Sequence, residues 1–163
     1  MVAKGLNHVS VNADDFDASI RFYGELFAAE RIPTPNFGFP VQWLRLGESQ
    51  LHLFKRRGSA PAYHHFAVTV AVDELEPIYE RAAKMDAFDR TTFGHHLYEL
   101  PGDCAQLYLR DPGGNLVEVD ALGASRVPKA LRADMKRLAD VNPQRPENQR
   151  ATLFLSGERP VAV

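Results

Sequence analysis

The chain has 163 residues, of which 45% are hydrophobic and 25% charged, and a formal net charge of −2. This composition gives no electrostatic footprint for nucleic acid, and no apolar stretch approaches the roughly 20 residues that span a bilayer. The single cysteine, Cys104, excludes an internal disulfide framework. It fits a reducing compartment, so we expect a cytoplasmic protein without a signal peptide, and Cys104 itself as a small buried hydrophobe.

A strand and a helix are expected near the N-terminus. Residues 8–11 alternate between polar and β-branched side chains, which is typical of a half-buried strand. Asp14 and Asp15 are candidate N-caps for the helix that follows. The apolar side chains of that helix recur at the spacing of one helical face: Phe16, Ile20, Tyr23 and Phe27.

Further strands complete this first pattern. Residues 33–40 contain three prolines and a glycine, so we expect them to be irregular or to form a sheet edge. Residues 41–46 and 50–54 alternate in polarity and predict two strands joined by a short turn. The predicted order is therefore a strand, a helix and then two or three strands.

The same order returns after a Gly-Ser-Ala-Pro linker. Residues 65–70 predict a strand, and Asp73 is the expected cap of the helix that follows. The apolar stripe of this helix comprises Leu75, Ile78, Tyr79, Ala82 and Ala83. Residues 105–110 and 116–119 predict two strands joined by a turn, whereas residues 91–103 give no clear pattern beyond one extra turn.

An internal repeat relates the two halves, with modules at about residues 5–57 and 63–121. The Asn-His-Val-Ser-Val stretch of the first module superposes on the His-His-Phe-Ala-Val stretch of the second. This register places His8 opposite His65.

The far ends of the modules match as well. Gly47 precedes His52 by five residues, and Gly113 precedes Glu118 by five. His52 therefore occupies the position equivalent to Glu118. Two modules related by a pseudo-twofold axis are expected to bring all four positions to one place.

Residues 122–163 belong to neither module and form a C-terminal extension. Ser125 and Pro128 predict the start of one helix. Its narrow apolar stripe comprises Leu131, Met135 and Leu138. Residues 151–155 suit a short strand. We expect the extension to pack on the body of the protein or on a partner subunit.

The four repeat-related side chains suit a metal ion. Glu118 lies between apolar neighbours, and a buried carboxylate is rare unless it is paired or coordinates a cation. His8, His65 and Glu118 form a two-histidine, one-carboxylate set that binds Fe(II), Mn, Zn, Ni or Co and leaves positions open. With His52 as a fourth ligand, two octahedral positions remain for water or a bidentate substrate. We expect one divalent ion.

The sequence resembles the vicinal oxygen chelate superfamily, which includes glyoxalase I, extradiol dioxygenases, fosfomycin-resistance thiol transferases and bleomycin-binding proteins. The resemblance covers about residues 5–121. The motifs that carry it are Asn7-His8-Val9-Ser10-Val11, Ala18-Ser19-Ile20-Arg21-Phe22-Tyr23, His64-His65-Phe66-Ala67-Val68 and Asp111-Pro112-Gly113-Gly114-Asn115-Leu116-Val117-Glu118. It implies an α+β fold in which two tandem βαβββ modules form a curved mixed sheet around a metal-binding cleft.

Carried over position by position, the resemblance implies His8, His65 and Glu118 as ligands and His52 at the family's variable fourth position. Two motifs depart from the family pattern. The first helix ends in Phe-Ala-Ala rather than Leu-Gly, and the last turn reads Asp-Pro-Gly-Gly rather than Asp-Pro-Asp-Gly. We expect the second departure to loosen a hairpin and leave the fold intact.

Among the reactions of the family, the resemblance favours extradiol-type cleavage of a catechol. Tyr108 lies ten residues before Glu118, which matches the active-site tyrosine of such dioxygenases. His95 and His96 are candidate proton-transfer groups. The substrate is expected to be a small molecule, and a homodimer is expected because an open sheet leaves edges that need covering.

Three alternatives stay open. A glyoxalase- or epimerase-type lyase or isomerase would use the metal to polarise a carbonyl. A fosfomycin thiol transferase matches at His8, Ser10, His65, Tyr108 and Glu118, but its phosphonate-binding lysine and serines are not recognisable between residues 86 and 106. A ligand-sequestering protein of the bleomycin-binding type generally lacks the metal ligands that this chain keeps.

Overall fold

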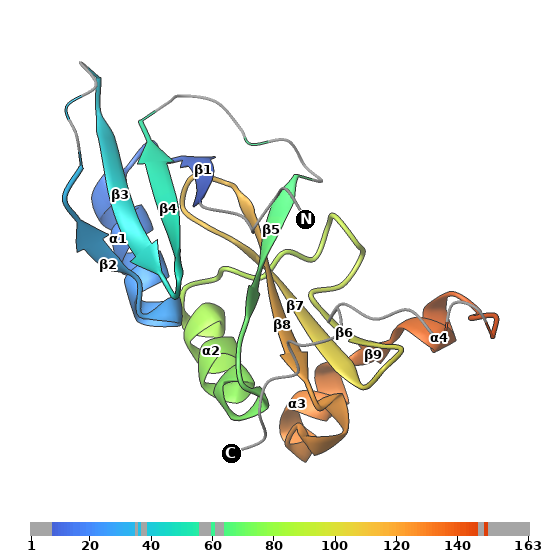
Figure 1. Ribbon diagram of the computed structural model, residues 1–163. Helices are drawn as coiled ribbons and strands as arrows, with labels where there is room; N and C mark the ends of the chain where they lie inside the picture. Colours follow the sequence, from blue (N-terminus) through green and yellow to red (C-terminus); the bar gives the residue numbers. More distant parts are fainter. Residues whose placement is uncertain are drawn as a thin grey trace, which may run out of the picture. The chain divides into compact units, whose positions relative to one another are not determined.

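The computed structural model describes residues 8–34, 36, 39–55, 60, 64–146 and 149. It is an α+β fold built from two βαβββ modules and a C-terminal extension, as the sequence predicts (Figure 1). Among the described residues, no helix is long and apolar enough to cross a membrane.

The first module forms a four-stranded mixed sheet with one helix. Its elements are β1 (His8–Asn12), α1 (Phe16–Phe27), β2 (Glu30–Ile32), β3 (Val41–Leu46) and β4 (Ser49–Phe54). The strand order is β1-β4-β3-β2, in which β1 runs parallel to β4 and the other pairs are antiparallel. The first strand of the module thus lies next to its last strand.

The second module repeats this arrangement. Its elements are β5 (His65–Thr69), α2 (Val72–Lys84), β6 (Leu97–Leu100), β7 (Cys104–Arg110) and β8 (Leu116–Leu122). The strand order is β5-β8-β7-β6, and the short strand β9 (Lys136–Arg137) continues it. Strand β6 lies within residues 91–103, for which no regular element was predicted.

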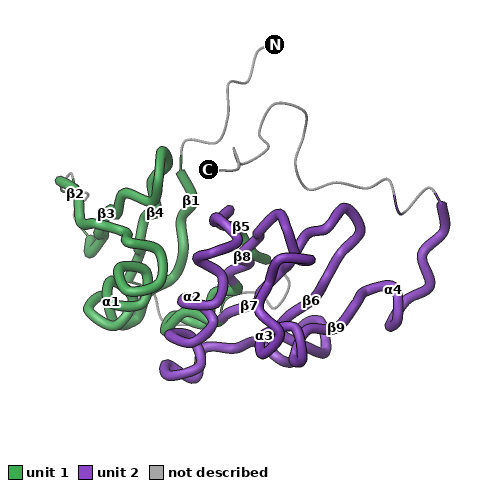
Figure 2. Tube along the Cα trace, turned by 90° about the horizontal axis from the view of Figure 1, so that it is seen from below, with its two compact units in different colours: residues 1–66, 110–116 green, residues 67–109, 117–163 purple. Residues whose placement is uncertain are grey.

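The chain divides into two compact units, coloured separately in Figure 2. The first comprises residues 1–66 and 110–116, and the second comprises residues 67–109 and 117–163. The turn before β8 therefore belongs to the unit of the first module, although it is contiguous with a strand of the second.

Helix α1 begins and ends as its local sequence dictates. The Asp15 side chain accepts a hydrogen bond from the Ala18 amide at 3.0 Å, which satisfies one of the free N–H groups of the first turn. At the other end, Ala28 adopts the left-handed conformation at φ 53°, where glycine is usual. The buried face consists of Ser19, Phe22, Tyr23 and Leu26. This face overlaps the predicted stripe at Tyr23 only.

Helix α2 differs from the prediction at its start. Ala71 is the N-cap and makes no side-chain capping bond, so Asp73 is a first-turn residue and not the cap. A carboxylate there still interacts favourably with the positive end of the helix dipole. The predicted apolar stripe is confirmed at Leu75, Ile78 and Ala82, which are buried, whereas Tyr79 is half-buried and Ala83 is exposed.

The described part of the extension, residues 122–146 and 149, contains two short α-helices where one helix was expected. After the 3-10 helix η1 (Ala124–Arg126) come α3 (Lys129–Asp134), β9 and α4 (Leu138–Val141). Met135 interrupts the helix with extended backbone at φ −77° and ψ 129°. The interruption lets β9 pair in parallel with β6, so that the extension covers the sheet edge that β6 would expose. Residues 151–155, a predicted strand, lie outside the described residues.

A buried polar network fixes the turn before β8 within the first unit. The Tyr23 hydroxyl donates to Asp111 Oδ2 at 2.7 Å. Asn115 donates to the same carboxylate through its backbone N–H and through its side-chain NH₂ group. Asn115 also exchanges hydrogen bonds with the backbone of Asn12 in β1. A Cβ atom on Gly113 would lie 2.2 Å from the Asn12 carbonyl oxygen. The Asp-Pro-Gly-Gly turn is therefore closely packed rather than loose.

Candidate metal centre and active site

Two of the predicted ligands meet on the first sheet. Strand β4 lies between β1 and β3, and the register places Ser10 and Trp43 on either side of His52. The imidazole rings of His8 and His52 stack with centroids 4.2 Å apart and planes inclined by 17°. The Trp43 indole also stacks on His52, at 4.3 Å and 6°. His52 thus contacts an aromatic ring on each of its two neighbouring strands.

His52 is buried and held by its neighbours. Its Nε2 lies 3.0 Å from Gln50 Oε1, and the residue is 6% exposed. Burial lowers the pKa of His52 below its usual range, and the nearby His8 lowers it further. A neutral His52 that donates through Nε2 to Gln50 accounts for this arrangement.

His65 is at the first position of β5 and is exposed. Within the first unit, it lines a pocket of about 260 Å³ together with Ser10, His64 and Asn115. His8 and His65 therefore both come from first strands of their modules, as the repeat predicts. Glu118 belongs to the second unit.

Glu118 lies in the middle of β8 and is only 6% exposed. Gln106 of the neighbouring strand β7 donates its side-chain N–H to Glu118 Oε1 at 2.7 Å. The Tyr108 hydroxyl donates to Gln106 Oε1 at 2.8 Å. Because side chains two residues apart on a strand point to the same face, Gln106 and Tyr108 both lie beside the carboxylate.

Tyr108 thus lies close to Glu118 in the structure. Burial raises the pKa of Tyr108 far above its usual range, and the Glu118 carboxylate raises it further. A tyrosine in this environment keeps its proton and serves as a hydrogen-bond donor. Gln106 was not predicted, although its position two residues before Tyr108 is the signal that would have found it.

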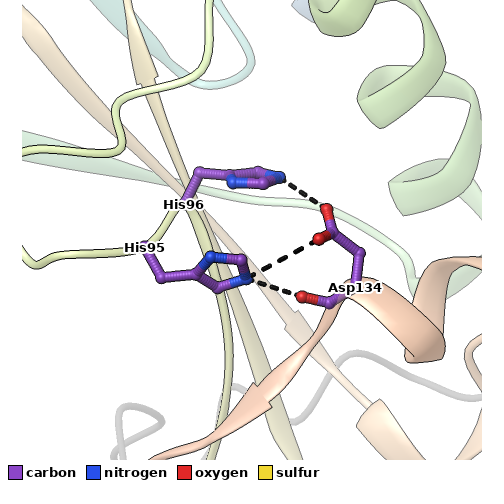
Figure 3. A group of neighbouring side chains, drawn as sticks. All are labelled: His95, His96 and Asp134. Carbon is purple, nitrogen blue, oxygen red and sulfur yellow. Dashed lines mark hydrogen bonds and ion pairs between the residues drawn. The ribbon is translucent and has the colours of Figure 1, made fainter.

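His95 and His96 contact a different group, the Asp134 residue. Figure 3 shows both rings directed at Asp134, the last residue of α3. His96 Nε2 lies 2.8 Å from Asp134 Oδ2, and His95 Nε2 lies 2.6 Å from the Asp134 backbone oxygen. The Tyr79 hydroxyl of α2 donates to Asp134 Oδ2 at 2.5 Å. No sequence pattern linked residue 134 to residues 95 and 96.

The titration behaviour of this group follows from its surroundings. Burial lowers the pKa of His96, although Asp134 opposes that effect. Burial and the hydrogen bond to Asp134 raise the pKa of Tyr79 to about 12. For Asp134, burial acts to raise the pKa, but the Tyr79 hydrogen bond and the two imidazoles lower it overall.

The donor set of the predicted centre fits a divalent metal ion. Two imidazoles and one carboxylate are the ligands that such ions share, and the carboxylate is held by a hydrogen bond from a neighbouring side chain. The remaining coordination positions would be open to water or substrate.

Comparisons with known proteins identify the family of the chain. The sequence matches the family described as Glyoxalase/Bleomycin resistance protein/Dioxygenase superfamily over residues 5–119. It is 26% identical over 120 residues to a protein named metallothiol transferase FosB from Lysinibacillus sphaericus, covering 72% of this chain and 82% of that protein.

Solved structures share the fold at lower identity. Lactoylglutathione lyase from Agrobacterium tumefaciens superposes with a TM-score of 0.57 at 23% identity, covering 74% of this chain and 96% of that one. A variant of the fosfomycin resistance protein FosX from Listeria monocytogenes, in complex with Mn(II) and 1S,2S-dihydroxypropylphosphonic acid, gives 0.60 at 16% identity, with coverage of 76% and 96%. The family match spans most of the chain, and the repeated βαβββ fold agrees with it. The chain therefore belongs to the Glyoxalase/Bleomycin resistance protein/Dioxygenase superfamily.

Proposed function

We propose that the chain is a divalent-metal-dependent enzyme that acts, without a redox step, on a small substrate that chelates the ion through two oxygens. His8, His65 and Glu118 are the metal ligands in this proposal. The observation that carries it is the hydrogen-bonded series from Tyr108 through Gln106 to Glu118, which orients a buried carboxylate. Ligand carboxylates are commonly oriented in this way by a second layer of residues.

When bound, the ion would act as a Lewis acid toward a substrate oxygen. The side chains around it have separate tasks. Gln106 holds Glu118 in one orientation, and it is held in turn by Tyr108. Tyr108 keeps its proton and is suited to donate a hydrogen bond to a substrate oxygen that gains negative charge.

His52 is a positioning residue in this proposal rather than a fourth ligand. Its ring is stacked between Trp43 and His8, and its Nε2 is engaged by Gln50. Both contacts hold the ring against the sheet. The stacked imidazole thereby restricts the rotation of the His8 ring and keeps that ligand oriented.

A non-redox reaction is favoured over catechol cleavage by the position of the two other histidines. Both rings are engaged by Asp134, which occupies the groups that catechol cleavage would use for proton transfer. The similarity to proteins named as a metallothiol transferase and as a fosfomycin resistance protein suggests the first reaction to test, which is opening of the epoxide of a small phosphonate. A thiol or water forms the new bond to carbon while one C–O bond of the epoxide breaks, and the epoxide oxygen takes up a proton. The pocket that Ser10 and His65 line is of a size suited to such a molecule.

Extradiol cleavage remains the second candidate, because Tyr108 lies beside Glu118 as that chemistry requires. The two reactions differ in the metal and in oxygen use. Ring cleavage depends on Fe(II) and consumes oxygen, whereas Lewis-acid chemistry does neither.

The test begins with metal analysis of protein purified without oxygen. We expect the His8→Ala, His65→Ala and Glu118→Gln variants each to contain about one equivalent less metal than the unsubstituted chain. His64→Ala is the matched control, because this neighbour of His65 is a histidine outside the proposed ligand set, and it should keep the full content. A metal content that none of these substitutions lowers would overturn the ligand assignment.

Activity then separates the two reactions. Protein loaded with Mn(II), Zn(II), Ni(II) or Co(II) is assayed with fosfomycin plus cysteine by phosphorus NMR, and with methylglyoxal plus glutathione by absorbance. Turnover of either substrate that is lost in Glu118→Gln supports the proposal. Oxygen uptake by iron-loaded protein with a catechol would replace it by the dioxygenase assignment.

A further inference from the structure

A second cluster of metal-binding side chains lies within the second unit. One ligand atom from each of His95, His96 and Asp134 can be chosen so that all three lie within 4.8 Å of one another. The histidines precede β6, and Asp134 ends α3, so the cluster joins the C-terminal extension to the second module (Figure 3). The cluster shares no residue with the proposed centre at His8, His65 and Glu118.

The His96 ring has no satisfactory hydrogen bond of its own. The residue is 2% exposed, and neither ring nitrogen makes a hydrogen bond to another described residue. Its Nε2 faces Asp134 Oδ2 at 2.8 Å in an ion-pair contact, and its Nδ1 has no hydrogen-bond partner among the described residues. Buried polar atoms are normally satisfied, so an imidazole in this state indicates a missing partner. A cation placed between the imidazole and the carboxylate would take the place of the proton and accept the electron pair of this nitrogen.

The ring cannot easily turn away to find another partner. Phe88 stacks on His96 with centroids 4.2 Å apart, and Tyr79 stacks on it at 5.8 Å. The Arg90 guanidinium contacts the Phe88 ring at 5.1 Å from its centroid. The aromatic neighbours therefore hold the His96 imidazole in place.

Asp134 is oriented by a neighbour as a metal-binding carboxylate commonly is. The Tyr79 hydroxyl donates to Oδ2 from α2, across 55 residues of sequence. A residue of this kind fixes the carboxylate and leaves its other electron pairs available. The carboxylate side chain is 41% exposed, so solvent and ions have access to the cluster from that side.

We propose that His95, His96 and Asp134 form a binding site for one Zn(II) ion, with water completing the coordination. Two imidazoles and one carboxylate suit zinc, whose bonds to these atoms are about 2.0–2.1 Å and whose tetrahedral ligands lie roughly 3.4 Å apart. His96 Nε2 lies 2.8 Å from Oδ2 and His95 Nε2 lies 4.0 Å from Oδ1, so small side-chain movements would bring the three groups to that spacing. Coordination by His95 exchanges its present hydrogen bond to the Asp134 backbone oxygen for a bond to the ion.

Binding at this site has a structural consequence. Asp134 is followed directly by the extended residue Met135 and by β9, which pairs with β6. An ion held by Asp134 and the two histidines therefore fastens the extension to the sheet edge. Zinc should protect the extension from proteolysis as well as bind with measurable affinity.

The experiment titrates Zn(II) into Glu118→Gln protein, in which the proposed first centre is disabled, with a chromophoric zinc indicator as competitor. One equivalent is expected to bind. Asp134→Asn and His95→Ala should each weaken binding by at least about tenfold. Asp140→Asn, a substitution in α4 of the same extension, is the matched control and should bind like the parent.

Two further measurements keep the test decisive if one of these variants fails to fold. Asp134→Asn preserves the size of the side chain, and its circular dichroism spectrum reports whether the fold is kept. Co(II) added to the Glu118→Gln protein should give the visible absorption of a coordinated ion, which Asp134→Asn abolishes. Absence of binding at millimolar Zn(II), or binding that neither Asp134→Asn nor His95→Ala changes, would show that the cluster is only a structural contact.

Discussion

The hydrogen bond between Tyr23 and Asp111 offers the sharpest test of how the fold is held together. Tyr23 is fully buried in α1, and its hydroxyl donates to Asp111 Oδ2 at 2.7 Å. Burial raises the pKa of Tyr23 well above its usual range, and Asp111 raises it further, so the hydroxyl stays protonated. Tyr23→Phe removes this one donor and almost no volume.

The expected loss of stability depends on the hydrogen bonds that the Asp111 carboxylate keeps in the variant. Asp111 retains donors from the Asn115 amide and side chain, so the substitution weakens the solvation of a buried charge without abolishing it. Hydrogen bonds to charged groups contribute about 1.5–3 kcal/mol. We therefore expect Tyr23→Phe to lower the free energy of unfolding by about 1.5–3 kcal/mol, with no change in the dependence on denaturant.

The loss should also depend on pH. Burial raises the pKa of Asp111 above 3.8, although hydrogen bonds from Tyr23 and Asn115 oppose this. A raised pKa in the folded state means that acid relieves the cost of burying the charge, and that this relief is lost as the pH rises through the folded-state value. The difference in the free energy of unfolding between the variant and the unsubstituted chain should therefore be largest at pH 7.5. It should become smaller on acidification, as Asp111 takes up a proton.

The assay is urea unfolding at pH 7.5 and at pH 5, followed by circular dichroism. Tyr98→Phe is the matched control, because the Tyr98 hydroxyl donates to a neutral acceptor, the Phe93 carbonyl oxygen, at 2.8 Å. It should cost about 0.5–1.5 kcal/mol at both pH values. A loss below about 0.5 kcal/mol for Tyr23→Phe, or one that does not narrow in acid, would refute the reasoning.

The remaining predictions concern three other features. Gly113→Ala should lower the free energy of unfolding in urea by at least about 1–3 kcal/mol, because its Cβ would overlap the backbone of β1. Gly47→Asn is the control, since Gly47 has φ 57° and open space around it, and its loss of stability should be far smaller. Equal losses in the two variants would contradict the packing argument. Burial raises the pKa of Cys104 to about 12, so iodoacetamide should alkylate the folded chain at least ~100-fold more slowly than the unfolded one, as followed by mass spectrometry. Burial lowers the pKa values of His52 and His96 below 6.5, so the unfolded chain takes up protons first and the free energy of unfolding, measured with a chelator present, should fall as the pH drops below about 6.5. Substitution of either histidine by Gln should flatten that profile, and stability that rises in acid would contradict it.

Local sequence determined the elements because their signals lie within a few residues. The alternation at β1, β3 and β4 and the cap at Asp15 depend only on short-range sterics and hydrogen bonds. The repeat then predicted the fold, since two copies of one pattern build two similar sheets. The resemblance singled out Tyr108 as an active-site candidate, and the structure links it to Glu118 through Gln106.

Features that depend on distant contacts were beyond the sequence. The face of α1 that is buried is decided by what packs on it, so the stripe moved from Phe16 and Ile20 toward Phe22 and Leu26. Strand β6 has few strand-forming signals of its own and is defined by pairing with β7 and β9.

The sequence alone thus determined the βαβββ repeat and the candidate ligands His8, His65 and Glu118. The tertiary structure alone decided what His95 and His96 contact. Their partner, Asp134, is about 40 residues away along the chain and reaches them only because Met135 interrupts a helix and β9 adds to the sheet edge. Periodicity can predict which face of an element is apolar, but it carries no information about which distant element will be packed against that face.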